Sequence, residues 1–167
     1  MTDPIAADAA DVSVEADGQR WLIAWYPPDS APAGRRHGSI GLCVTDARQI
    51  VLVSADGVRW DLPGGRPEAH ETWEQTLRRE VSEEACATVV TARLLGFTRG
   101  RCVDGVERGR VLVRAFWCAA VVLDAWQPRF ETTHRTCVAP VELTNGLTVE
   151  SGYLPIYRRA LVESGLV

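Results

Sequence analysis

Three glutamates, Glu80, Glu83 and Glu84, stand close together in the segment REVSEE. On an α-helix, residues three or four positions apart lie on one face, so the three carboxylates would share a face. Like charges at these spacings destabilise a bare helix by about 0.2–0.5 kcal/mol per pair, and a divalent cation would offset that repulsion. Mg²⁺ prefers carboxylate oxygens, waters and substrate phosphates. The cluster therefore predicts a metal–diphosphate site, although on its own it would also fit a solvated acidic face.

The loop before the expected helix could bring backbone oxygen atoms to the same site. Gly64 and Gly65 permit positive φ angles and let the backbone approach a metal closely. The Gly64 carbonyl is therefore a candidate ligand. Glu71 lies just before the helix, and Arg79 is its expected partner across the short loop. We expect this ion pair to fix the loop to the helix.

The spacing of these residues resembles a known signature. Gly65 is followed after five residues by Glu71, and after seven more by the run REVSEE from 79 to 84. This run is similar to the box of the MutT-like Nudix hydrolases, G-x5-E-x7-R-E-U-x-E-E-x-G-U, where U is aliphatic. The preceding segment WDLPGG, residues 60–65, resembles the lead-in of members that act on nucleoside triphosphates.

The resemblance spans Gly65 to Ala87 and departs from the family pattern at Cys86, which replaces the usual glycine. That glycine sits where the helix ends and often takes a left-handed conformation. A residue with a Cβ atom costs roughly 1 kcal/mol there. The change could shift the turn that leaves the helix, and with it the position of Glu84.

The resemblance implies an α/β fold, an α/β/α sandwich with a mixed sheet, and an enzyme that hydrolyses a diphosphate bond in a nucleoside diphosphate linked to another moiety X. It makes Glu83 and Glu84 the principal ligands of Mg²⁺, for which Mn²⁺ could substitute. Glu80 would be a ligand or the general base, and the Gly64 carbonyl a further ligand. Glu71 and Arg79 would form the structural ion pair. A water activated by Mg²⁺ or a carboxylate would attack one phosphorus.

Residues outside the box supply further candidates, each with a plainer alternative. Glu131, ahead of Glu142, and His134 could serve as a downstream acid or base, or could simply be loop surface. Arg110 and Arg114 could hold substrate phosphates, whereas the other arginines near the 104–105 turn suit a solvated hairpin tip. Two tryptophans could stack on a base or belong to the core, namely Trp60 and Trp126.

The choice of substrate depends on two absences. No proline occurs between 67 and 128, and no tyrosine between 26 and 153. Some ADP-ribose hydrolases and some dinucleoside polyphosphate hydrolases carry these residues downstream of the box. We therefore favour a (d)NTP or a modified nucleotide. The alternative is a Nudix-fold nucleotide-binding or regulatory protein that has lost activity, for which Cys86 is the argument.

Short apolar runs predict the strands that must position this site, and two helices accompany them. Thr72 and Gln75 form a capping box, and Trp73, Leu77 and Val81 give the first helix a buried stripe. Asp104-Gly105 predicts a hairpin. Ser151 and Pro155 open the second helix, which Gly165 ends. Strands are expected at 20–26, 39–45, 50–54, 88–100, 110–123 and 136–143, with loops at 27–38 and 124–135.

Length and composition limit the partners. The 167 residues suit one domain at 20–167, after a disordered, acidic and alanine-rich segment at 1–19. No apolar run approaches the roughly 20 residues of a membrane span. The net charge of -4 gives little attraction for nucleic-acid polymers, although all 18 basic residues are arginine. Five scattered cysteines fit the reducing cytoplasm. The strand at 20–26 could form the edge of a homodimer.

Overall fold

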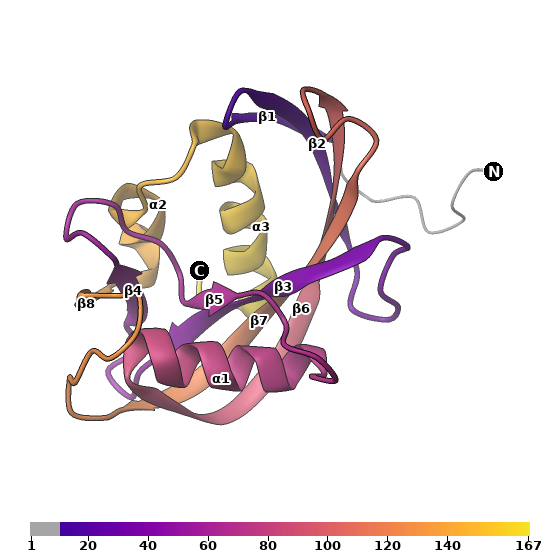
Figure 1. The fold of residues 1–167 in the computed structure, drawn as a ribbon. Helices are drawn as coiled ribbons and strands as arrows, with labels where there is room; N and C mark the ends of the chain where they lie inside the picture. Colours follow the sequence, from indigo (N-terminus) through magenta and orange to yellow (C-terminus); the bar gives the residue numbers. More distant parts are fainter. Residues whose placement is uncertain (1–10) are drawn as a thin grey trace.

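A mixed β-sheet runs through the molecule in the order β1-β2-β6-β7-β3-β4-β8, with β5 paired beside β3 (Figure 1). The computed structural model describes residues 11–167. The strands are β1 (Val12–Ala16), β2 (Gln19–Tyr26), β3 (Arg35–Val44), β4 (Ile50–Ser54), β5 (Gly64–Gly65), β6 (Ala87–Asp104), β7 (Val111–Leu123) and β8 (His134–Val138). The helices are α1 (Trp73–Ala85), α2 (Leu143–Gly146) and α3 (Leu154–Ser164), with 3₁₀ turns η1 (Pro140–Glu142) and η2 (Ser151–Tyr153).

The centre of the sheet is the parallel pair of β3 and β7, and the other strand pairs are antiparallel. The predicted hairpin at Asp104-Gly105 is confirmed, because β6 and β7 are neighbouring antiparallel strands on either side of it. The mixed pairing brings β3, β7 and the short β5 together. Because β5 belongs to the segment that leads to α1, its pairing with β3 fixes that segment on the sheet.

Two apolar clusters lie on opposite faces of the sheet and create the layers. On β4, Ile50 and Leu52 join the cluster under α2 and α3, whereas Val51 and Val53 join the cluster under α1. This alternation follows from the two-residue period of a strand. Figure 1 shows α1 on one side of the sheet and α3 on the other. The predicted α/β sandwich with a mixed sheet is therefore confirmed.

Local sequence signals set both ends of α1. The hydroxyl of Thr72 accepts from the Gln75 amide, and the Gln75 side chain accepts from the Thr72 amide, which confirms the capping box. Leu77 and Val81 are fully buried against the sheet, and Trp73 packs at the edge of the same cluster. The helix is therefore held by its apolar stripe, which leaves its acidic face free for the site.

The C-cap of α1 is Cys86, in the left-handed conformation with φ 46° and ψ 54°. This is the position at which the family pattern has glycine. The chain thus keeps the turn that the glycine would make, and the cost falls on the Cβ atom of Cys86.

Replacing Cys86 with glycine is expected to raise the free energy of unfolding by about 0.5–1 kcal/mol, because glycine has no Cβ atom to strain a left-handed turn. Urea unfolding of the two proteins measures the difference. Cys86→Ala is the matched control, since it removes the thiol and keeps the Cβ atom. Equal stabilisation by both variants would mean that the thiol, and not the backbone conformation, is the source of the strain.

The N-terminal prediction is wrong for residues 12–19. Val12–Ala16 forms β1, which pairs with β2, and Val14 is fully buried in the core. The polar residues between the apolar ones hid a strand with one buried face. The predicted disorder of residues 1–10 lies outside the described residues. The proposed dimer edge at 20–26 is wrong for residues 20–23, because β1 and β6 pair β2 on both sides there.

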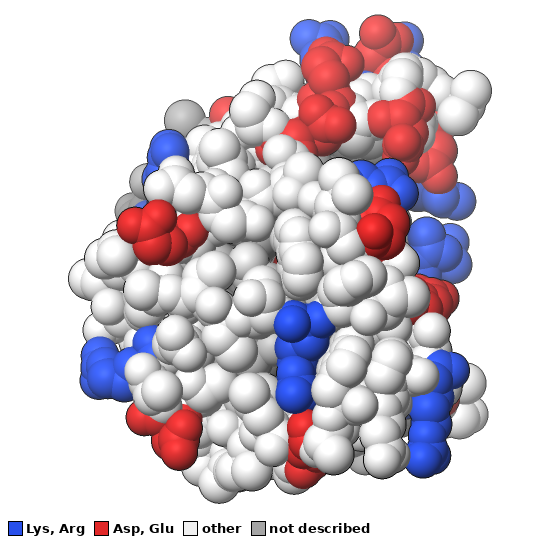
Figure 2. All heavy atoms as spheres, turned by 90° about the vertical axis from the view of Figure 1, so that its left-hand side faces the viewer, with Lys and Arg blue, Asp and Glu red and all other residues white. Residues whose placement is uncertain are grey.

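Two predicted loops are shorter than expected. β3 begins at Arg35 and β8 at His134, because pairing with β7 and with β4 extends polar residues into strands. Figure 2 shows the face seen from the left side of Figure 1, on which acidic and basic side chains are scattered among uncharged ones. Within residues 11–167, no helix is long and apolar enough to span a membrane.

Candidate active site

A cavity of about 730 Å³ lies between α1, the loop that carries β5, and the downstream loop before β8. One side of it is acidic and is built mainly by α1. Two arginines and one neutral histidine also line the cavity. The acidic residues are Asp61, Glu68, Glu80, Glu83, Glu84 and Glu131, and the other titratable residues are His37, Arg66 and Arg114, with Arg79 among the acids.

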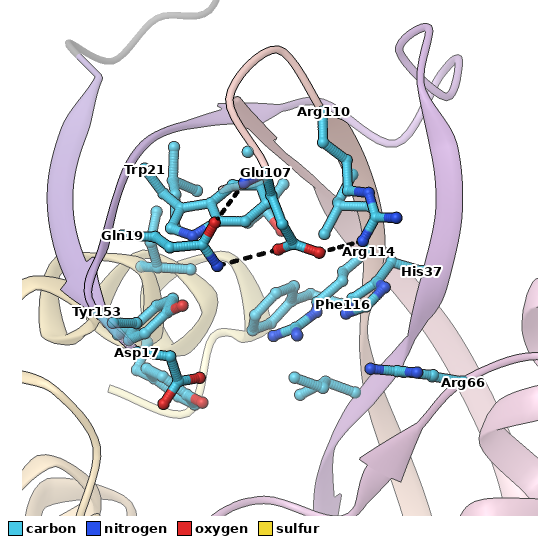
Figure 3. Close-up of a pocket in the computed structure, with 18 residues that line it drawn as sticks. Asp17, Gln19, Trp21, His37, Arg66, Glu107, Arg110, Arg114, Phe116 and Tyr153 are labelled. Carbon is cyan, nitrogen blue, oxygen red and sulfur yellow. Dashed lines mark hydrogen bonds and ion pairs between the residues drawn. The ribbon is translucent and has the colours of Figure 1, made fainter. Parts of the chain in front are cut away.

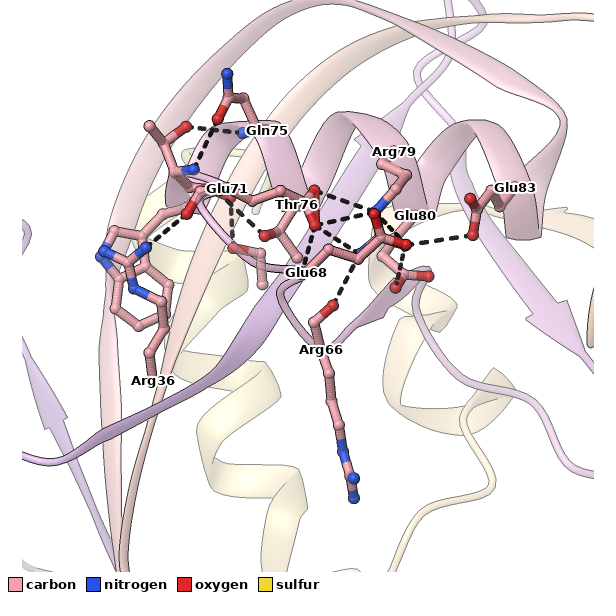
Figure 4. A network of polar contacts seen from close by, with 12 residues as sticks. Arg36, Arg66, Glu68, Glu71, Gln75, Thr76, Arg79, Glu80 and Glu83 are labelled. Atoms are coloured by element: carbon pink, nitrogen blue, oxygen red, sulfur yellow. Dashed lines mark hydrogen bonds and ion pairs between the residues drawn. The ribbon is translucent and has the colours of Figure 1, made fainter.

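Arg79 is the centre of the polar network in this cavity (Figure 4). Its Nε lies 3.1 Å from both carboxylate oxygens of Glu71, which is the ion pair expected across the loop. Its two terminal nitrogens donate to Glu80 at 2.9 Å, to Glu83 at 3.3 Å and to the Arg66 carbonyl at 2.8 Å. Hydrogen bonds from Arg79 lower the pKa of Glu71. One guanidinium therefore fixes the loop and orients two acids of the helix.

Glu84 has a different environment, because no arginine contacts its carboxylate among the described residues. Its Oε2 accepts a hydrogen bond of 2.9 Å from the Gly64 amide. Burial raises the pKa of Glu84 to about 7, and the negative charges of Glu80, Glu131 and Asp61 act in the same direction. Burial also raises the pKa of Glu80. A carboxylate held under these conditions would be stabilised by a cation.

The donor set fits a hard divalent cation. Among residues 11–167, no three His, Cys, Asp or Glu side chains already converge as a closed metal cage. Mg²⁺ does not need one, since it binds through one or two carboxylates and keeps waters or phosphate oxygens. Glu80, Glu83 and Glu84 offer carboxylate oxygens on one wall, and the cavity leaves room for the remaining ligands. The site therefore fits Mg²⁺ bound together with a phosphorylated substrate.

Gly64 and Gly65 are explained by the close approach of their backbone to β3 and to Glu80, and not by their backbone conformation. Neither Gly64 nor Gly65 has a positive φ angle, so the expectation of positive φ is wrong. A Cβ atom on Gly65 would overlap the Glu80 carboxylate, and one on Gly64 would lie 2.5 Å from the Ser39 carbonyl oxygen. Glycine lets β5 pass between β3 and the acidic face of α1.

The downstream loop is tied to the C-terminal end of α1 by two side chains. Thr132 donates to the Glu84 carbonyl at 2.5 Å. Arg135 donates to the carbonyls of Ala85 at 2.8 Å and Cys86 at 2.9 Å, and its guanidinium lies 5.1 Å from the ring of Trp126. The last turn of α1 contains no basic residue, so Arg135 supplies the positive charge that a helix C-terminus favours. The same loop carries Glu131 into the cavity.

A second cavity, of about 270 Å³, adjoins the first (Figure 3). Four residues line both cavities, namely His37, Ile40, Arg66 and Arg114. Burial, and then the charges of Arg114, Arg66 and Arg35, lower the pKa of His37 to about 4, so its imidazole is neutral at pH 7. The aromatic residues of this cavity are Trp21, Phe116, Tyr153 and Tyr157.

The structure brings some of the predicted outer residues into these cavities. Glu131 lines the first cavity, Arg114 lines both, and Arg110 lines the second, where it pairs with Glu107. The other three lie elsewhere. His134 contacts Thr133 and packs edge-on against Trp60, and Trp126 stacks under Arg135. His134, Trp60 and Trp126 line neither cavity, which contradicts their predicted placement at the site.

Sequence reasoning missed the residues that reach the cavities from distant segments. Arg66 directly follows the two glycines, and that position was a usable signal. His37, Trp21 and Tyr153 had no such signal, because only the pairing of β2, β3 and β7 and the packing of η2 brings them together. Asp61, within the segment WDLPGG, was also missed as a site residue. Its carboxylate lines the first cavity and accepts a hydrogen bond of 2.9 Å from the Tyr157 hydroxyl.

A family model described as "NUDIX domain" matches residues 35–158. Proteins of two Mycobacterium tuberculosis strains, whose name provisionally assigns them as 8-oxo-dGTP diphosphatase 3, are 37% identical over 113 residues. The match covers 56% of this chain and 50% of each relative. The chain thus spans about half the length of the curated relatives it matches.

Solved structures share the fold at low sequence identity. The pyrophosphohydrolase BsRppH of Bacillus subtilis superposes with a TM-score of 0.66 at 20% identity, over 92% of this chain and 97% of that one. The hydrolase RenU of M. smegmatis gives 0.57 at 19% identity, over 96% and 97%. The Nudix domain of Shewanella oneidensis NrtR, complexed with ADP-ribose, gives 0.58 at 18% identity, over 81% and 91%.

Proposed function

The chain belongs to the Nudix family, and on that premise we propose that it is a pyrophosphohydrolase that cleaves a diphosphate bond in a nucleotide, with Mg²⁺ as its cofactor. One observation carries this proposal. Five glutamates, three of them on α1, line a single cavity together with Arg66 and Arg114. A bound cation would neutralise the charges of the glutamates, and a bound diphosphate would neutralise those of the two arginines.

The roles of the side chains follow from where they lie. Glu83 and Glu84 would hold the metal, with Glu80 as a further ligand or as the general base, and the Gly64 carbonyl as another ligand. Arg66 and Arg114, which line the same cavity, would hold phosphate oxygens. Glu131 lines the same cavity, and its neighbour Thr132 is hydrogen-bonded to the Glu84 carbonyl, so Glu131 would be an alternative general base. When bound, Mg²⁺ would neutralise oxygens on which charge builds during phosphorus–oxygen cleavage.

The substrate we propose is a nucleoside triphosphate, with an oxidised purine nucleotide such as 8-oxo-dGTP first. The name of the M. tuberculosis relatives supports this choice, and so do the missing proline and tyrosine downstream of the box. The second cavity also supports it, because its aromatic side chains adjoin the proposed phosphate site and could stack on a base.

Phosphate and pyrophosphate release from a panel of nucleotides tests the proposal. The panel holds dGTP, 8-oxo-dGTP, the other triphosphates, ADP-ribose and dinucleoside polyphosphates, each with Mg²⁺, with Mn²⁺ or with EDTA. We expect metal-dependent turnover of a triphosphate that Glu83→Gln abolishes. Binding of a nucleotide without turnover of any substrate would favour instead a Nudix-fold binding or regulatory protein.

The proposal also covers the cellular compartment and the oligomeric state. The five cysteines are free thiols, which supports a reducing compartment, and we propose the cytoplasm. A homodimer formed by strand pairing would use the edge strands of the sheet, β1 or β8. Sedimentation of the purified chain at several concentrations would test it.

A further inference from the structure

The second cavity is walled in part by a segment outside the matched domain. The family model begins at residue 35, whereas Asp17, Gln19, Trp21 and Ile23 belong to β1, β2 and their turn. η2 and α3 also contribute to the lining, through Tyr153 and Tyr157. This part of the cavity is therefore built by the N-terminal hairpin, which lies outside the residues that the family model matches.

The size of the cavity suits one part of a substrate. Its volume of about 270 Å³ is slightly below the roughly 300–1,000 Å³ typical of ligand pockets. Trp21, Phe116 and Tyr153 give it aromatic surfaces on which a planar ring could stack. A single base, with its phosphates outside the cavity, matches this shape and lining.

The charges of the cavity give it a direction. Arg66, Arg114 and His37 line both cavities and so mark the junction between them. In Figure 3, Asp17 lies beside Tyr153 on the side of the cavity away from Arg66. A nucleotide whose phosphates lie at the junction would therefore direct its base toward Asp17.

The polar groups on this side that make no side-chain hydrogen bond within residues 11–167 are the Asp17 carboxylate and the Tyr153 hydroxyl, and of the two only the carboxylate can accept two adjacent hydrogen bonds. Gln19 and Glu107 satisfy each other, since Gln19 Nε2 donates to Glu107 at 3.1 Å and the Glu107 amide donates to Gln19 Oε1 at 2.8 Å. Glu107 also pairs with Arg110. Within residues 11–167, no side chain or amide donates a hydrogen bond to the Asp17 carboxylate.

The turn that carries Asp17 fixes its place. Asp17 and Gly18 have φ angles of 51° and 71°, and Ala16 pairs with Gln19 on either side of them. This is a two-residue hairpin turn of the kind that Asp-Gly favours. The carboxylate thus stands on a short, paired hairpin, and not on a long loop.

We propose that Asp17 reads the base of the substrate and selects a guanine-type ring, an inference that rests on the function proposed above. An ionised carboxylate only accepts hydrogen bonds. Guanine presents two adjacent donors, the ring N1–H and the 2-amino group, and a guanine oxidised at C8 keeps both. Adenine presents one amino donor beside a ring nitrogen that is an acceptor, and that acceptor would face the carboxylate without a hydrogen bond.

The test compares kcat/KM for dGTP, dATP and dITP, which lacks the 2-amino group, in the wild type and in Asp17→Asn. We expect the wild type to prefer dGTP, and the variant to lose about 10- to 100-fold of the dGTP-to-dATP ratio, since an amide pairs with adenine better than a carboxylate does. Asparagine tolerates the left-handed turn, so the variant should fold. An unchanged ratio would overturn the inference.

Glu15→Gln is the matched control, because it removes one acid from the same hairpin. Glu15 is exposed and lies between Val14 and Ala16, so it points to the other face of the sheet. The ratio should stay at the wild-type value in this variant. A loss equal to that of Asp17→Asn would mean that net charge, and not the position of Asp17, sets the preference.

Binding of dGMP and dAMP, measured by calorimetry, separates this inference from the hydrolase proposal. Tighter binding of dGMP that Asp17→Asn removes, in a protein without turnover, would support the base site and reject the hydrolase. Metal-dependent turnover with equal binding of both monophosphates would support the hydrolase and reject the base site. No binding of either monophosphate and no base preference in turnover would also overturn the role of Asp17.

Discussion

Replacing Glu84 with glutamine is expected to lower metal-dependent turnover by about 10²- to 10³-fold while it stabilises the metal-free protein. The amide oxygen of glutamine can still accept the hydrogen bond from the Gly64 amide. The substitution removes a negative charge that is unfavourable in the metal-free protein, because Glu84 is largely buried and lies near the acids Glu80, Glu131 and Asp61. Activity and stability should therefore change in opposite directions.

The stabilisation should depend on pH with a defined sign. Glu84 has a pKa of about 7 in the folded protein, above the ordinary value of 4.5. The folded state therefore holds the proton more tightly than the unfolded state, and the wild type loses stability as pH rises from about 4.5 to 7. Urea unfolding in EDTA should show no gain for Glu84→Gln near pH 4.5 and a gain of about 1–2 kcal/mol at pH 8.

A matched variant exists on the same helix. Glu74 lies in the first turn of α1, paired with Arg78 at the surface and away from the cavity. Glu74→Gln should leave turnover unchanged and alter stability by no more than about 0.5 kcal/mol. If Glu84→Gln destabilised the metal-free protein at pH 8, then the carboxylate of Glu84 would be a structural group, and its role as a metal ligand would lose its main support.

Arg79 is expected to show the largest effect on folding. We expect Arg79→Ala to lower the free energy of unfolding by about 3 kcal/mol and Arg79→Lys by about 2 kcal/mol, measured by urea unfolding. The arginine side chain is only 21% exposed, and it bonds three carboxylates and one carbonyl at once. Lysine is a point charge and cannot reproduce a planar fork with several donors.

Two further variants make this prediction specific. Arg159→Lys alters an exposed pair with Glu163, and it should cost no more than about 0.5 kcal/mol. Glu71→Gln combined with Arg79→Lys should cost less than the sum of the single changes, because Glu71 and Arg79 contact each other. Additive losses, or a loss below about 0.5 kcal/mol for Arg79→Lys, would show that the network does not support the loop.

The parts of the site that could be predicted are those whose partners are close in sequence. Thr72 and Gln75 are three residues apart, so the geometry of the first helical turn brings them into contact. Glu71 and Arg79 are eight apart, and the short turn just before α1 brings the Glu71 carboxylate back to the helix. The spacing of Glu80, Glu83 and Glu84 puts them on one face for the same reason. The hairpin at Asp104-Gly105 and the turn at Gly165 followed from the conformations that those residues favour.

The parts that could not be predicted depend on pairing between distant strands. The pairing of β2 with β6, and of β3 with β7, brings Trp21, His37 and Arg114 to the same cavity. Arg114 was a candidate because it lies on a strand after the 104–105 turn, but no local pattern indicates that Trp21 and His37 lie beside it. Trp60 and Trp126 were placed near the site by their sequence positions, but their rings pack against His134 and Arg135 instead. A position in the chain does not fix where a side chain points.

The hydrogen bonds from Arg135 to the end of α1 also affect how the protein unfolds locally. One guanidinium bonds the carbonyls of Ala85, Cys86 and Asp124, so the last turn of the helix and the start of the downstream loop cannot come apart independently. Local unfolding should occur in a single unit that contains both segments, and their amide hydrogens should exchange with solvent at one common rate. Glu84 and Glu131 would then be exposed to solvent in the same fluctuation, and a large substrate could gain entry to the cavity through that opening without disturbing the sheet.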